Sequence, residues 1–551
     1  MKKVFWIFLL LFSTLTSKAQ FAGGSGTEKS PYLVSDAYQL SDVRNYPNSY
    51  FKQINDIDLS EWISDNSPRQ GWAPINGFNG TYDGGGYVIK GLEIYRSTSN
   101  NIGLFGDNSG SLNNIVLQGA VIEGANNVGF ICGLSNATIS GCVVNGGKLT
   151  ATDHVGGIVG SSTADIEDCY VFAEQIVASG DCGGVVGNTL HSVSRNYVYA
   201  NITSSGNAGG VVGYSYYYDA WRGYSDPIVR NGKLSDCRYD GNIFSTQNSG
   251  GIIGLDGSHY YNKKYLWLTS NEADYTLEEG LNINNCLVGP GSIKSENTAC
   301  GIVYRDGPYC LGYQTSNSIC TSSIIEGFPS FRIQNVSEGY KNIASMKTIL
   351  ITNGNSDENI EDNDLNGVAY GEKTLYRSST YTGLSWDMAN TWAIEEGQSL
   401  PYLRSMSTPP SVSSYTVGGK CIVRGKCSSN GYVTLFKKGN VYTSQILDGN
   451  FEINIGAVNI GDTIYYNAVA LGKKPSVIKY FIAEEHPEPE IIMGDSNSDG
   501  VVDAVDVVGT INYILGKPSS SFNQQNADVN KDGQILVDDA VGTINVIMNN
   551  Q

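Results

Sequence analysis

Short apolar runs bounded by glycine recur through the first half of the chain. Four copies follow one another at a nearly constant interval, and each combines small residues with β-branched or other apolar residues before a closing glycine. The copies, with two later ones, are Val128–Gly133, Val155–Gly160, Cys182–Gly187, Ala208–Gly213, Ser249–Gly254 and Cys300–Val303. Strands this short cannot bury their apolar face alone, whereas copies stacked coil on coil share one continuous core. The period therefore predicts a mainly β protein whose body is a right-handed parallel β-helix.

A second recurring strand lies between these copies and places a cysteine at one register. The residues at the shared position are Cys142, Cys169, Asn196, Cys237 and Cys286. Free cysteine packs as a small apolar residue. We therefore expect this column to stack inside the β-helix, while the disulfide state of the 11 cysteines stays open.

Beyond Pro409 and Pro410, apolar and polar residues alternate between 415 and 482, with Gly-Asn and Asp-Gly turns. Alternation with period two is typical of half-buried strands. We predict a small β-sandwich spacer over residues 406–483, after a β-helix at 20–405. Residues 484–493 are rich in proline and glutamate, which predicts an extended linker.

Two 12-residue loops near the C-terminus carry oxygen side chains at positions 1, 3, 5 and 12, with glycine at position 6. A hard Ca²⁺ ion needs this spacing when one short turn must wrap it. Counting the backbone carbonyl at position 7, the predicted ligands are Asp495, Asn497, Asp499, Val501, Asp503 and Asp506 in the first loop and Asp528, Asn530, Asp532, Gln534 and Asp539 in the second. Position 9 is Asp503 in the first loop but Leu536 in the second. The second site should therefore lose one ligand and bind Ca²⁺ more weakly.

The paired loops, the near-identical Gly-Thr-Ile-Asn helices that follow them and their C-terminal position resemble the type I dockerin family. Position 12 departs from an ordinary EF-hand because it is aspartate instead of glutamate, and the helix that would precede the first loop is missing, which suits dockerins. The resemblance implies a small α-helical dockerin at 494–551 that holds two Ca²⁺ ions and docks onto a cohesin-type protein. The implied partner-binding residues are Thr510, Asn512, Thr543 and Asn545. Another part of this chain is an alternative partner.

The repeats between 20 and 405 resemble the GLUG-type repeats of adhesin-like bacterial surface proteins, of a type secreted by Bacteroidetes. Upstream segments resemble the family's N-terminal cap and first coils: Gly23–Tyr32, Asn55–Ser60, Trp72–Ile75, Phe78–Gly84 and Ile102–Gly106. Trp392–Gly397 and Leu400–Leu403 resemble its closing coil. The resemblance implies a body that recognises a surface ligand.

The N-terminus and the overall charge indicate the compartment. Lys2 and Lys3 precede an apolar run at 4–12, so residues 1–19 are predicted to be a signal peptide. A net charge of −19 and a pI near 4.6 disfavour nucleic acid and anionic lipid as partners. Later segments fall short of the roughly 20 apolar residues that a transmembrane helix needs. We expect a secreted protein without membrane insertion, extracellular or held at the cell surface by a partner.

Three insertions, at 214–231, 255–281 and 304–322, interrupt the repeat just after the same strand. In a solenoid they should emerge along one edge. They are rich in aromatic residues, whose faces suit sugar rings. The candidate glycan-binding residues are Tyr216, Tyr218, Trp221, Tyr261, Trp267 and Tyr309. The alternative is that these rings pack the insertions onto the flank of the solenoid.

An enzyme on this scaffold would need paired carboxylates in one cleft, or a base beside a charge neutraliser. Acidic and basic candidates occur near turns and insertions, without motif-grade spacing, at Asp153, Asp165, Asp168, Asp181, Asp219, Arg222, Asp226, Asp256, His259 and Arg305. Catalytic residues are therefore left unassigned. The sequence favours a calcium-binding modular protein with a glycan- or surface-binding body over the alternative, a glycoside hydrolase or polysaccharide lyase attached through its dockerin.

Overall fold

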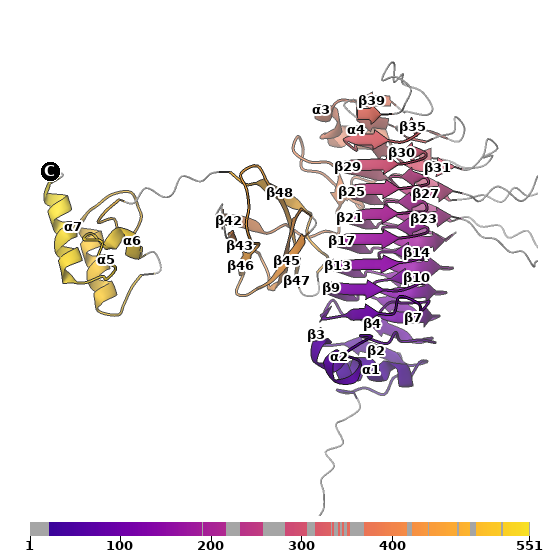
Figure 1. The fold of residues 1–551 in the computed structure, drawn as a ribbon, viewed down its shortest axis with the longest axis horizontal. Coiled ribbons are helices and arrows are strands. Elements are labelled where there is room, and N and C mark those ends of the chain that lie inside the picture. Colours follow the sequence, from indigo (N-terminus) through magenta and orange to yellow (C-terminus); the bar gives the residue numbers. More distant parts are fainter. Residues whose placement is uncertain are drawn as a thin grey trace, which may run out of the picture. The chain divides into compact units, whose positions relative to one another are not determined.

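The computed structural model describes residues 21–549 except for 190, 216–231, 257–280, 306–314, 332, 335–339, 342–343, 347–349, 353–367, 416–420, 439, 471–472, 485–491 and 520–521. The described residues form two compact units. The first comprises those within 1–415, 422–455 and 463–481, and the second those within 416–421, 456–462 and 482–551. Most of the first unit is a stack of short strands that lie side by side, one above another along the length of the body (Figure 1).

The strands of this stack form four parallel sheets. The first sheet has 11 strands. In stacking order they are β1 (Tyr32–Val34), β2 (Tyr50–Gln53), β4 (Thr81–Asp83), β8 (Ser111–Asn113), β12 (Ile139–Ser140), β16 (Ile166–Glu167), β20 (Val193–Ser194), β24 (Lys233–Ser235), β28 (Asn282–Asn284), β32 (Thr315–Ser316) and β36 (Tyr340–Lys341). We call it the β12 sheet.

The second sheet has 14 strands and is called the β13 sheet. Its strands are β3 (Ile57–Asp58), β5 (Val88–Lys90), β6 (Glu93–Tyr95), β9 (Val116–Glu123), β13 (Val143–Ala151), β17 (Tyr170–Ala178), β21 (Tyr197–Ser204), β25 (Arg238–Ser245), β29 (Leu287–Ser295), β33 (Ile319–Cys320), β34 (Ile324–Glu326), β37 (Ala344–Met346), β38 (Leu350–Thr352) and β39 (Val368–Tyr370). It contains the longest strands of the body, which are β9, β13, β17, β21, β25 and β29, each of eight or nine residues.

Two further sheets of seven strands each complete the coils. The β14 sheet holds β10 (Asn126–Gly129), β14 (Asp153–Gly156), β18 (Cys182–Gly183), β22 (Ala208–Gly209), β26 (Ser249–Gly250), β30 (Ala299–Cys300) and β35 (Ser330–Phe331). The β15 sheet holds β7 (Phe105–Asn108), β11 (Cys132–Ser135), β15 (Val159–Ser162), β19 (Val186–Thr189), β23 (Val212–Ser215), β27 (Ile253–Asp256) and β31 (Val303–Arg305).

The register of the strands confirms the parallel β-helix. Val143 lies opposite Tyr170, and Tyr170 lies opposite Tyr197, so these two coils advance by the same length of chain. The same strand of each coil therefore meets its copy in the next coil, and residues of one type form columns along the body.

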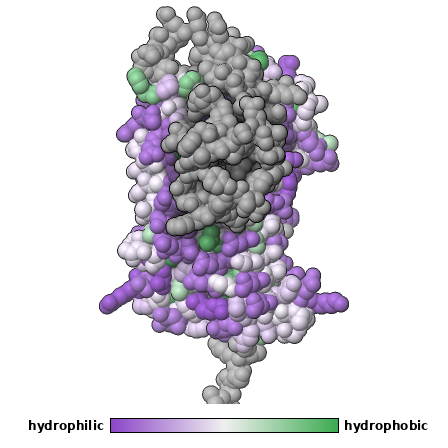
Figure 2. All heavy atoms as spheres, turned by 90° about the vertical axis from the view of Figure 1, so that its right-hand side faces the viewer, coloured by the Kyte–Doolittle hydropathy of each residue, from purple (hydrophilic) through white to green (hydrophobic). Residues whose placement is uncertain are grey.

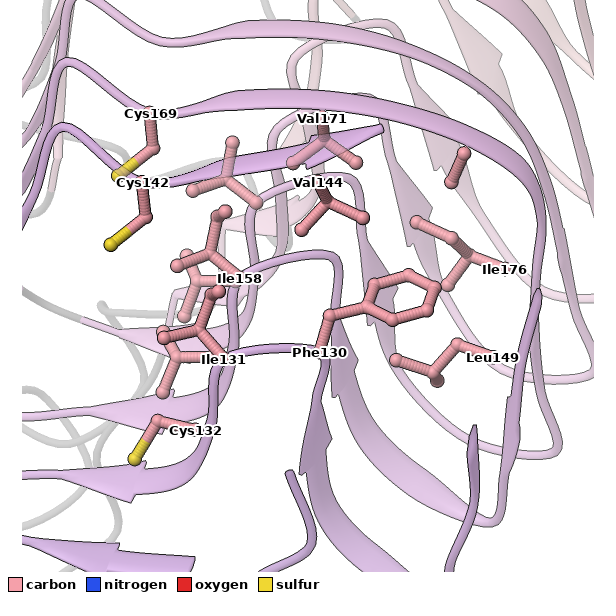
Figure 3. Packing of buried hydrophobic residues seen from close by; sticks show 14 of the residues in the cluster. Phe130, Ile131, Cys132, Cys142, Val144, Leu149, Ile158, Cys169, Val171 and Ile176 are labelled. Carbon is pink, nitrogen blue, oxygen red and sulfur yellow. The ribbon is translucent and has the colours of Figure 1, made fainter. Parts of the chain in front are cut away.

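The core consists of such columns. Ile131 and Ile158, Val144 and Val171, and Leu149 and Ile176 repeat their positions on neighbouring coils, all of them buried (Figure 3). At these positions neighbouring rungs present similar environments, so apolar side chains of similar size fit at each level.

The predicted cysteine column lies inside, as expected. The thiols of Cys142 and Cys169 donate to the backbone carbonyls of Ser140 at 3.5 Å and Glu167 at 3.3 Å, and both residues are fully buried. Burial raises the pKa of the Cys169 thiol well above its usual range, so it remains a protonated donor. Asn196 occupies the next rung and donates to the carbonyl of Ser194 at 3.0 Å, so a polar residue fits there without losing hydrogen bonds.

The residue before this column turns the corner of each coil in a left-handed backbone conformation. Asp168, Arg195, Asp236 and Asn285 have φ between 53° and 55°, and Gly141, which precedes Cys142, has φ of 67°. Asn and Asp tolerate this conformation best, because their short polar side chains bond locally. Arg195 is held there by Asp168, whose carboxylate oxygens lie 3.0 Å from Nε and 2.8 Å from Nη2.

A helical segment closes the N-terminal end of the stack. It comprises α1 (Ala37–Asp42), the 3₁₀ turn η1 (Val43–Asn45) and α2 (Ser60–Asn66). Beneath it, Trp72 is fully buried, donates its indole N–H to the Leu104 carbonyl at 3.1 Å and lies 5.1 Å below the guanidinium of Arg44. The edge strand β1 is paired further by Ala22 and Gly23, whose backbone groups bond to those of Leu33 at 2.9 Å.

Residues 372–406 cover part of the outer face of the β13 sheet. They contain α3 (Glu372–Leu375), α4 (Ser378–Gly383) and the antiparallel pair β40 (Trp392–Ala393) and β41 (Tyr402–Leu403). Trp392 is fully buried and donates to Asp236 at 3.0 Å. The expectation that Trp392–Leu403 forms a closing coil is therefore wrong, because these strands pair with each other and not with the parallel stack. The apolar outer column of Val143, Tyr170 and Tyr197 explains their position, since it joins them in one buried cluster.

The predicted β-sandwich consists of two antiparallel sheets. One holds β42 (Ser411–Tyr415), β43 (Ile422–Lys426) and β46 (Asn450–Asn454), and the other holds β45 (Asn440–Ile446), β44 (Gly431–Lys437), β47 (Thr463–Ala470) and β48 (Lys479–Ile482). Within the first unit it contacts the β13 sheet directly. Asn145 donates to the hydroxyl of Thr434 at 2.8 Å in a buried bond, and the rings of Tyr199 and Phe436 have centroids 5.3 Å apart. The sequence did not predict this contact.

Close stacking of the coils leads to a stability prediction at Gly157. A Cβ at this position would overlap the carbonyl oxygen of Gly184 and lie 2.9 Å from Cγ1 of Val171. Overpacking of this kind typically costs about 1–3 kcal/mol. We therefore expect Gly157→Ala to lower the thermal unfolding midpoint of the body in scanning calorimetry. Gly383→Ala is the matched control, because nothing lies within 4 Å of a Cβ there; equal midpoints for both variants would contradict the packing described.

Candidate functional site

The first predicted calcium loop folds around Asp495, which is 2% exposed. One carboxylate oxygen accepts from the backbone N–H of Asp499 at 3.1 Å and the other from Gly500 at 3.0 Å. Gly500 makes this turn with φ of 88°, which glycine adopts without strain. Asn497 and Asp499 each accept a backbone N–H two residues further on, so the oxygen side chains curl over the loop.

The second loop repeats this network at equivalent positions. Asp528 accepts from the backbone N–H groups of Asp532 at 3.1 Å and Gly533 at 2.8 Å, and Gly533 has φ of 82°. Asn530 and Asp532 accept from the residues two positions ahead, as in the first loop. The two copies of the loop therefore fold in the same way.

Position 12 of each loop is a fully buried carboxylate at the start of a helix. Asp506 in α5 (Ala504–Ile514) accepts from the backbone N–H of Asn497 at 3.1 Å and of Asp503 at 2.9 Å. Asp539 in α7 (Val537–Asn549) accepts from Asn530 at 3.3 Å and Leu536 at 2.9 Å. These bonds tie the end of each loop back to its beginning.

The donor set fits a calcium ion. Carboxylate, amide and carbonyl oxygens are the ligands of this hard cation, and each loop offers them at positions 1, 3, 5, 7 and 12. The buried carboxylates of Asp495, Asp506 and Asp539 are costly without a positive charge, which backbone N–H groups supply only in part. Both loops thus have the composition and the fold that a resident Ca²⁺ requires.

The predicted partner-binding residues differ in their exposure to solvent. Asn512 and Asn545 are exposed, whereas Thr510 and Thr543 are fully buried. Each threonine hydroxyl donates to the carbonyl four residues earlier, of Asp506 or Asp539, at 3.0 Å. The expectation that both threonines face a partner is therefore not met, because their hydroxyls secure the helix start at the metal loop.

Aliphatic side chains cover the exposed side of both helices. Equivalent residues of the two halves are exposed in pairs: Val508 at 55% and Val541 at 50%, Ile511 at 43% and Ile544 at 44%, and Leu515 and Met548 both at 67%. Spacings of three and four residues place each set on one helix face. We call these sets the α5 stripe and the α7 stripe. Exposed apolar faces of this kind mark interaction sites.

The three insertions of the body start from neighbouring strands. β23, β27 and β31 are adjacent in the β15 sheet, and β24, β28 and β32, which follow the insertions, are adjacent in the β12 sheet. The candidate glycan-binding residues Tyr216, Tyr218, Trp221, Tyr261, Trp267 and Tyr309 lie outside the described residues. Figure 2 shows the described surface on that side of the body as mostly hydrophilic.

A buried polar column lies at the ends of the three strands that precede the insertions in the chain. Ser215, Asp256 and Arg305 end the three strands, and each is at most 1% exposed. The hydroxyl of Ser215 lies 2.6 Å from Asp256, and Nε of Arg305 lies 3.4 Å from the same carboxylate. Asp256 and Arg305, which the sequence offered as candidates for chemistry, therefore neutralise each other inside the body.

Two other candidates, Asp153 and Asp181, form one cluster with His154 at a corner of the stack. Ligand atoms of Asp153, His154 and Asp181 lie within 4.8 Å of one another. Asp153 accepts from the backbone N–H of Asp181 at 2.8 Å, and Asp181 accepts from the amide of Asn207 at 2.7 Å. These bonds link successive coils, which is a structural role. The remaining candidates Asp219, Arg222, Asp226 and His259 lie outside the described residues.

Burial raises the pKa of the Asp181 carboxyl, with the charge of Asp153 as a lesser cause. A folded-state pKa above the unfolded value of about 3.9 means that stability decreases as the pH rises through the folded pKa. Asp181→Asn keeps the acceptor for Asn207 and removes the charge. We expect its thermal midpoint to exceed that of the parent by a few degrees at pH 7 and to match it below about pH 4. Asp165→Asn, at an exposed carboxylate that accepts from Ser192, should not reproduce this; a less stable Asp181→Asn at pH 7 would sink the explanation.

Two curated relatives match part of the chain. A protein of Evansella cellulosilytica, named provisionally as a Gly-rich membrane protein, is 42% identical over 115 residues, which are 19% of this chain and 13% of that protein. Halomucin of Haloquadratum walsbyi is 36% identical over 128 residues, which are 21% of this chain and 1% of that protein. The chain thus spans only a small part of the curated relatives that it matches.

Among solved structures, a crystal structure from Bacteroides ovatus, provisionally described as an immunoglobulin A1 protease, aligns with 17% identity and a TM-score of 0.34. The alignment covers 70% of this chain and 95% of that chain.

Residues 493–545 match the model of the dockerin type I domain. Domains of this family bind calcium and dock onto cohesins, and the proteins that carry them are generally extracellular or attached to a cell surface. Within the part of the chain that the structure describes, no helix is long and apolar enough to cross a membrane. The chain therefore carries a C-terminal dockerin type I domain together with a body of stacked parallel β-strands.

Proposed function

We propose that this is a secreted, calcium-binding modular protein whose dockerin attaches it to a cohesin-bearing partner, while its β-helix recognises a glycan or a cell-surface ligand. The observation that carries the proposal is the duplicated loop and helix at the C-terminus, whose two exposed apolar stripes accompany a match to the dockerin type I domain. An apolar surface of this kind requires a partner to cover it.

Two Ca²⁺ ions are proposed, one in each loop. Asp495, Asn497, Asp499 and Asp506 would hold the first, with the carbonyl of Val501 and with Asp503. The second loop would use Asp528, Asn530, Asp532, Asp539 and the carbonyl of Gln534. The bound ion would offset the buried negative charge, and the carboxylates of Asp506 and Asp539 would then fix the first turns of α5 and α7.

For the body, we propose GLUG-type repeats that recognise polysaccharide or a surface ligand through the three insertions. The aromatic content of the insertions and their attachment to neighbouring strands support this proposal. Two of the described carboxylates favour it over the enzyme alternative, since Asp256 and Asp168 are each paired with an arginine. Catalytic residues remain unassigned.

Export is proposed from residues 1–19, which lie outside the described residues. The lysine pair and the apolar run that follows it are typical of a signal peptide. An extracellular setting also supplies the calcium that the dockerin needs.

Docking is tested with the full chain on a panel of immobilised type I cohesins, in Ca²⁺ and in EGTA. Ile511→Asp and Ile544→Asp combined should weaken binding at least tenfold, because a charge would be buried at the centre of both stripes. Binding should also be lost in EGTA. Leu447→Asp is the matched control, since this leucine is 59% exposed in the β-sandwich. Retention of full affinity by the double variant would exclude the stripes as the docking surface.

Ligand recognition by the body is tested with the full chain on plant, host and microbial polysaccharides, scoring retention and product release together. We expect retention without products, lost in Trp221→Ala combined with Trp267→Ala because stacking on the sugar is removed. Tyr480→Ala is the control, since this ring is 61% exposed on β48. Release of reducing-end or unsaturated products would instead establish the hydrolase or lyase alternative.

A further inference from the structure

The two calcium loops differ at two linked positions. The first loop has Asp503 at position 9 and Val505 at position 11, whereas the second has Leu536 at position 9 and Asp538 at position 11. Each loop therefore keeps the same number of carboxylates in a different order. The sequence comparison at position 9 alone predicted a weaker second site.

Position 9 has a clear role in the first loop. Asp503 is the N-cap of α5: its carboxylate accepts from the backbone N–H of Val505 at 2.7 Å, and its own N–H donates to Asp506. Leu536 keeps only the second of these bonds, from its backbone N–H to Asp539 at 2.9 Å. Its side chain is 47% exposed and offers neither an acceptor nor a charge.

Asp538 lies within reach of the residues that would hold the second ion. One of its carboxylate oxygens accepts from Nδ2 of Asn530 at 2.9 Å, and the same Nδ2 lies 3.2 Å from Asp532. The Asn530 amide has its Nδ2 turned toward Asp538 and its Oδ1 turned to the loop, where it accepts from the N–H of Asp532 at 2.9 Å; Asn497 has the same orientation in the first loop, with Asp499 alone as the partner of its Nδ2. Val505, at the same place in the first loop, cannot accept such a bond.

We propose that Asp538 is a positioning residue of the second calcium site, which orients the Asn530 oxygen toward the ion and supplies the negative charge that Leu536 lacks. This inference rests on the proposed binding of calcium by both loops. Groups that hold a metal ligand by its second polar atom typically change metal affinity by about 10–100-fold. The second site then does not bind Ca²⁺ more weakly than the first, because the carboxylate at position 11 compensates for the ligand missing at position 9.

The test uses Ca²⁺ alone, titrated by calorimetry into the full chain. The first loop is silenced with Asp495→Ala and Asp499→Ala, so that the remaining heat belongs to the second. In this background, Asp538→Ala should lower Ca²⁺ affinity at least tenfold. Asp538→Asn keeps an acceptor for Asn530 and should lose less. Adding Leu536→Asp to Asp538→Ala returns the carboxylate to position 9 and should recover most of the affinity.

Two controls separate metal positioning from other effects. Val505→Ala, in a chain whose second loop is silenced with Asp528→Ala, should leave the first site unchanged. The thermal midpoint of Asp538→Ala in EGTA should equal that of its parent, whereas a role confined to the N-terminus of α7 would lower it.

The outcomes are distinct. Affinity of the second loop within twofold of its parent in Asp538→Ala, or a second loop that binds no Ca²⁺ while the first does, overturns the role of Asp538 and leaves the first site intact. A parent chain that binds no Ca²⁺ at either loop refutes the proposed calcium binding itself. A drop in affinity without rescue by Leu536→Asp would contradict the compensation between positions 9 and 11.

Discussion

The body depends on a parallel ladder in which a residue pairs with its counterpart one coil further along the chain. Val143, Tyr170 and Tyr197 meet at equal steps along the chain, so one outer column is built from three successive coils. This constraint makes glycine necessary where coils approach most closely, as at Gly157. It also explains how the core admits polar residues. Asn196 fits the cysteine column because two backbone carbonyls accept its amide, at 3.1 and 3.0 Å.

Most of this ladder could be predicted, because the sequence repeats with a nearly constant period. The strands of the coils, the inward column at Cys142 and Cys169 and the neighbouring origins of the insertions all follow from the repeat. The segment that covers the outer face of the β13 sheet could not be predicted from the repeat. Alternation along a strand shows that Val143 points away from the core, and thus that an apolar column needs cover. Residues 372–406 contain no copy of the repeat, so nothing in their pattern reveals that they lie against that column as an antiparallel pair.

The dockerin shows a different limit of prediction. Loop spacing was sufficient to locate the oxygen ligands, since their positions follow from the chemistry of the ion. The faces of the helices were harder to assign, because Thr510 and Ile511 belong to the same repeated tetrapeptide. The structure buries Thr510, whose hydroxyl bonds back to Asp506, and exposes Ile511. The interior of this small module includes the carboxylates of Asp506 and Asp539, while the aliphatic residues of the two stripes are exposed.

The loops link the proposed calcium sites to the fold of the helices and to the exposed stripes. Buried Asp506 and Asp539 hold the first turns of α5 and α7 to their loops, and the same turns begin the exposed stripes. The position of each stripe is therefore set by the loop that precedes it. The duplication repeats Ile511 as Ile544, so the two stripes are alike at their centres. The loops carry a carboxylate at position 9 in the first copy and at position 11 in the second, so the N-terminal borders of the stripes differ. A partner would meet exposed Val505 at the start of α5 and the carboxylate of Asp538 at the start of α7. Any preference of that partner for one half would arise at these borders or at Leu515 and Met548, since the centres of the stripes are chemically equivalent.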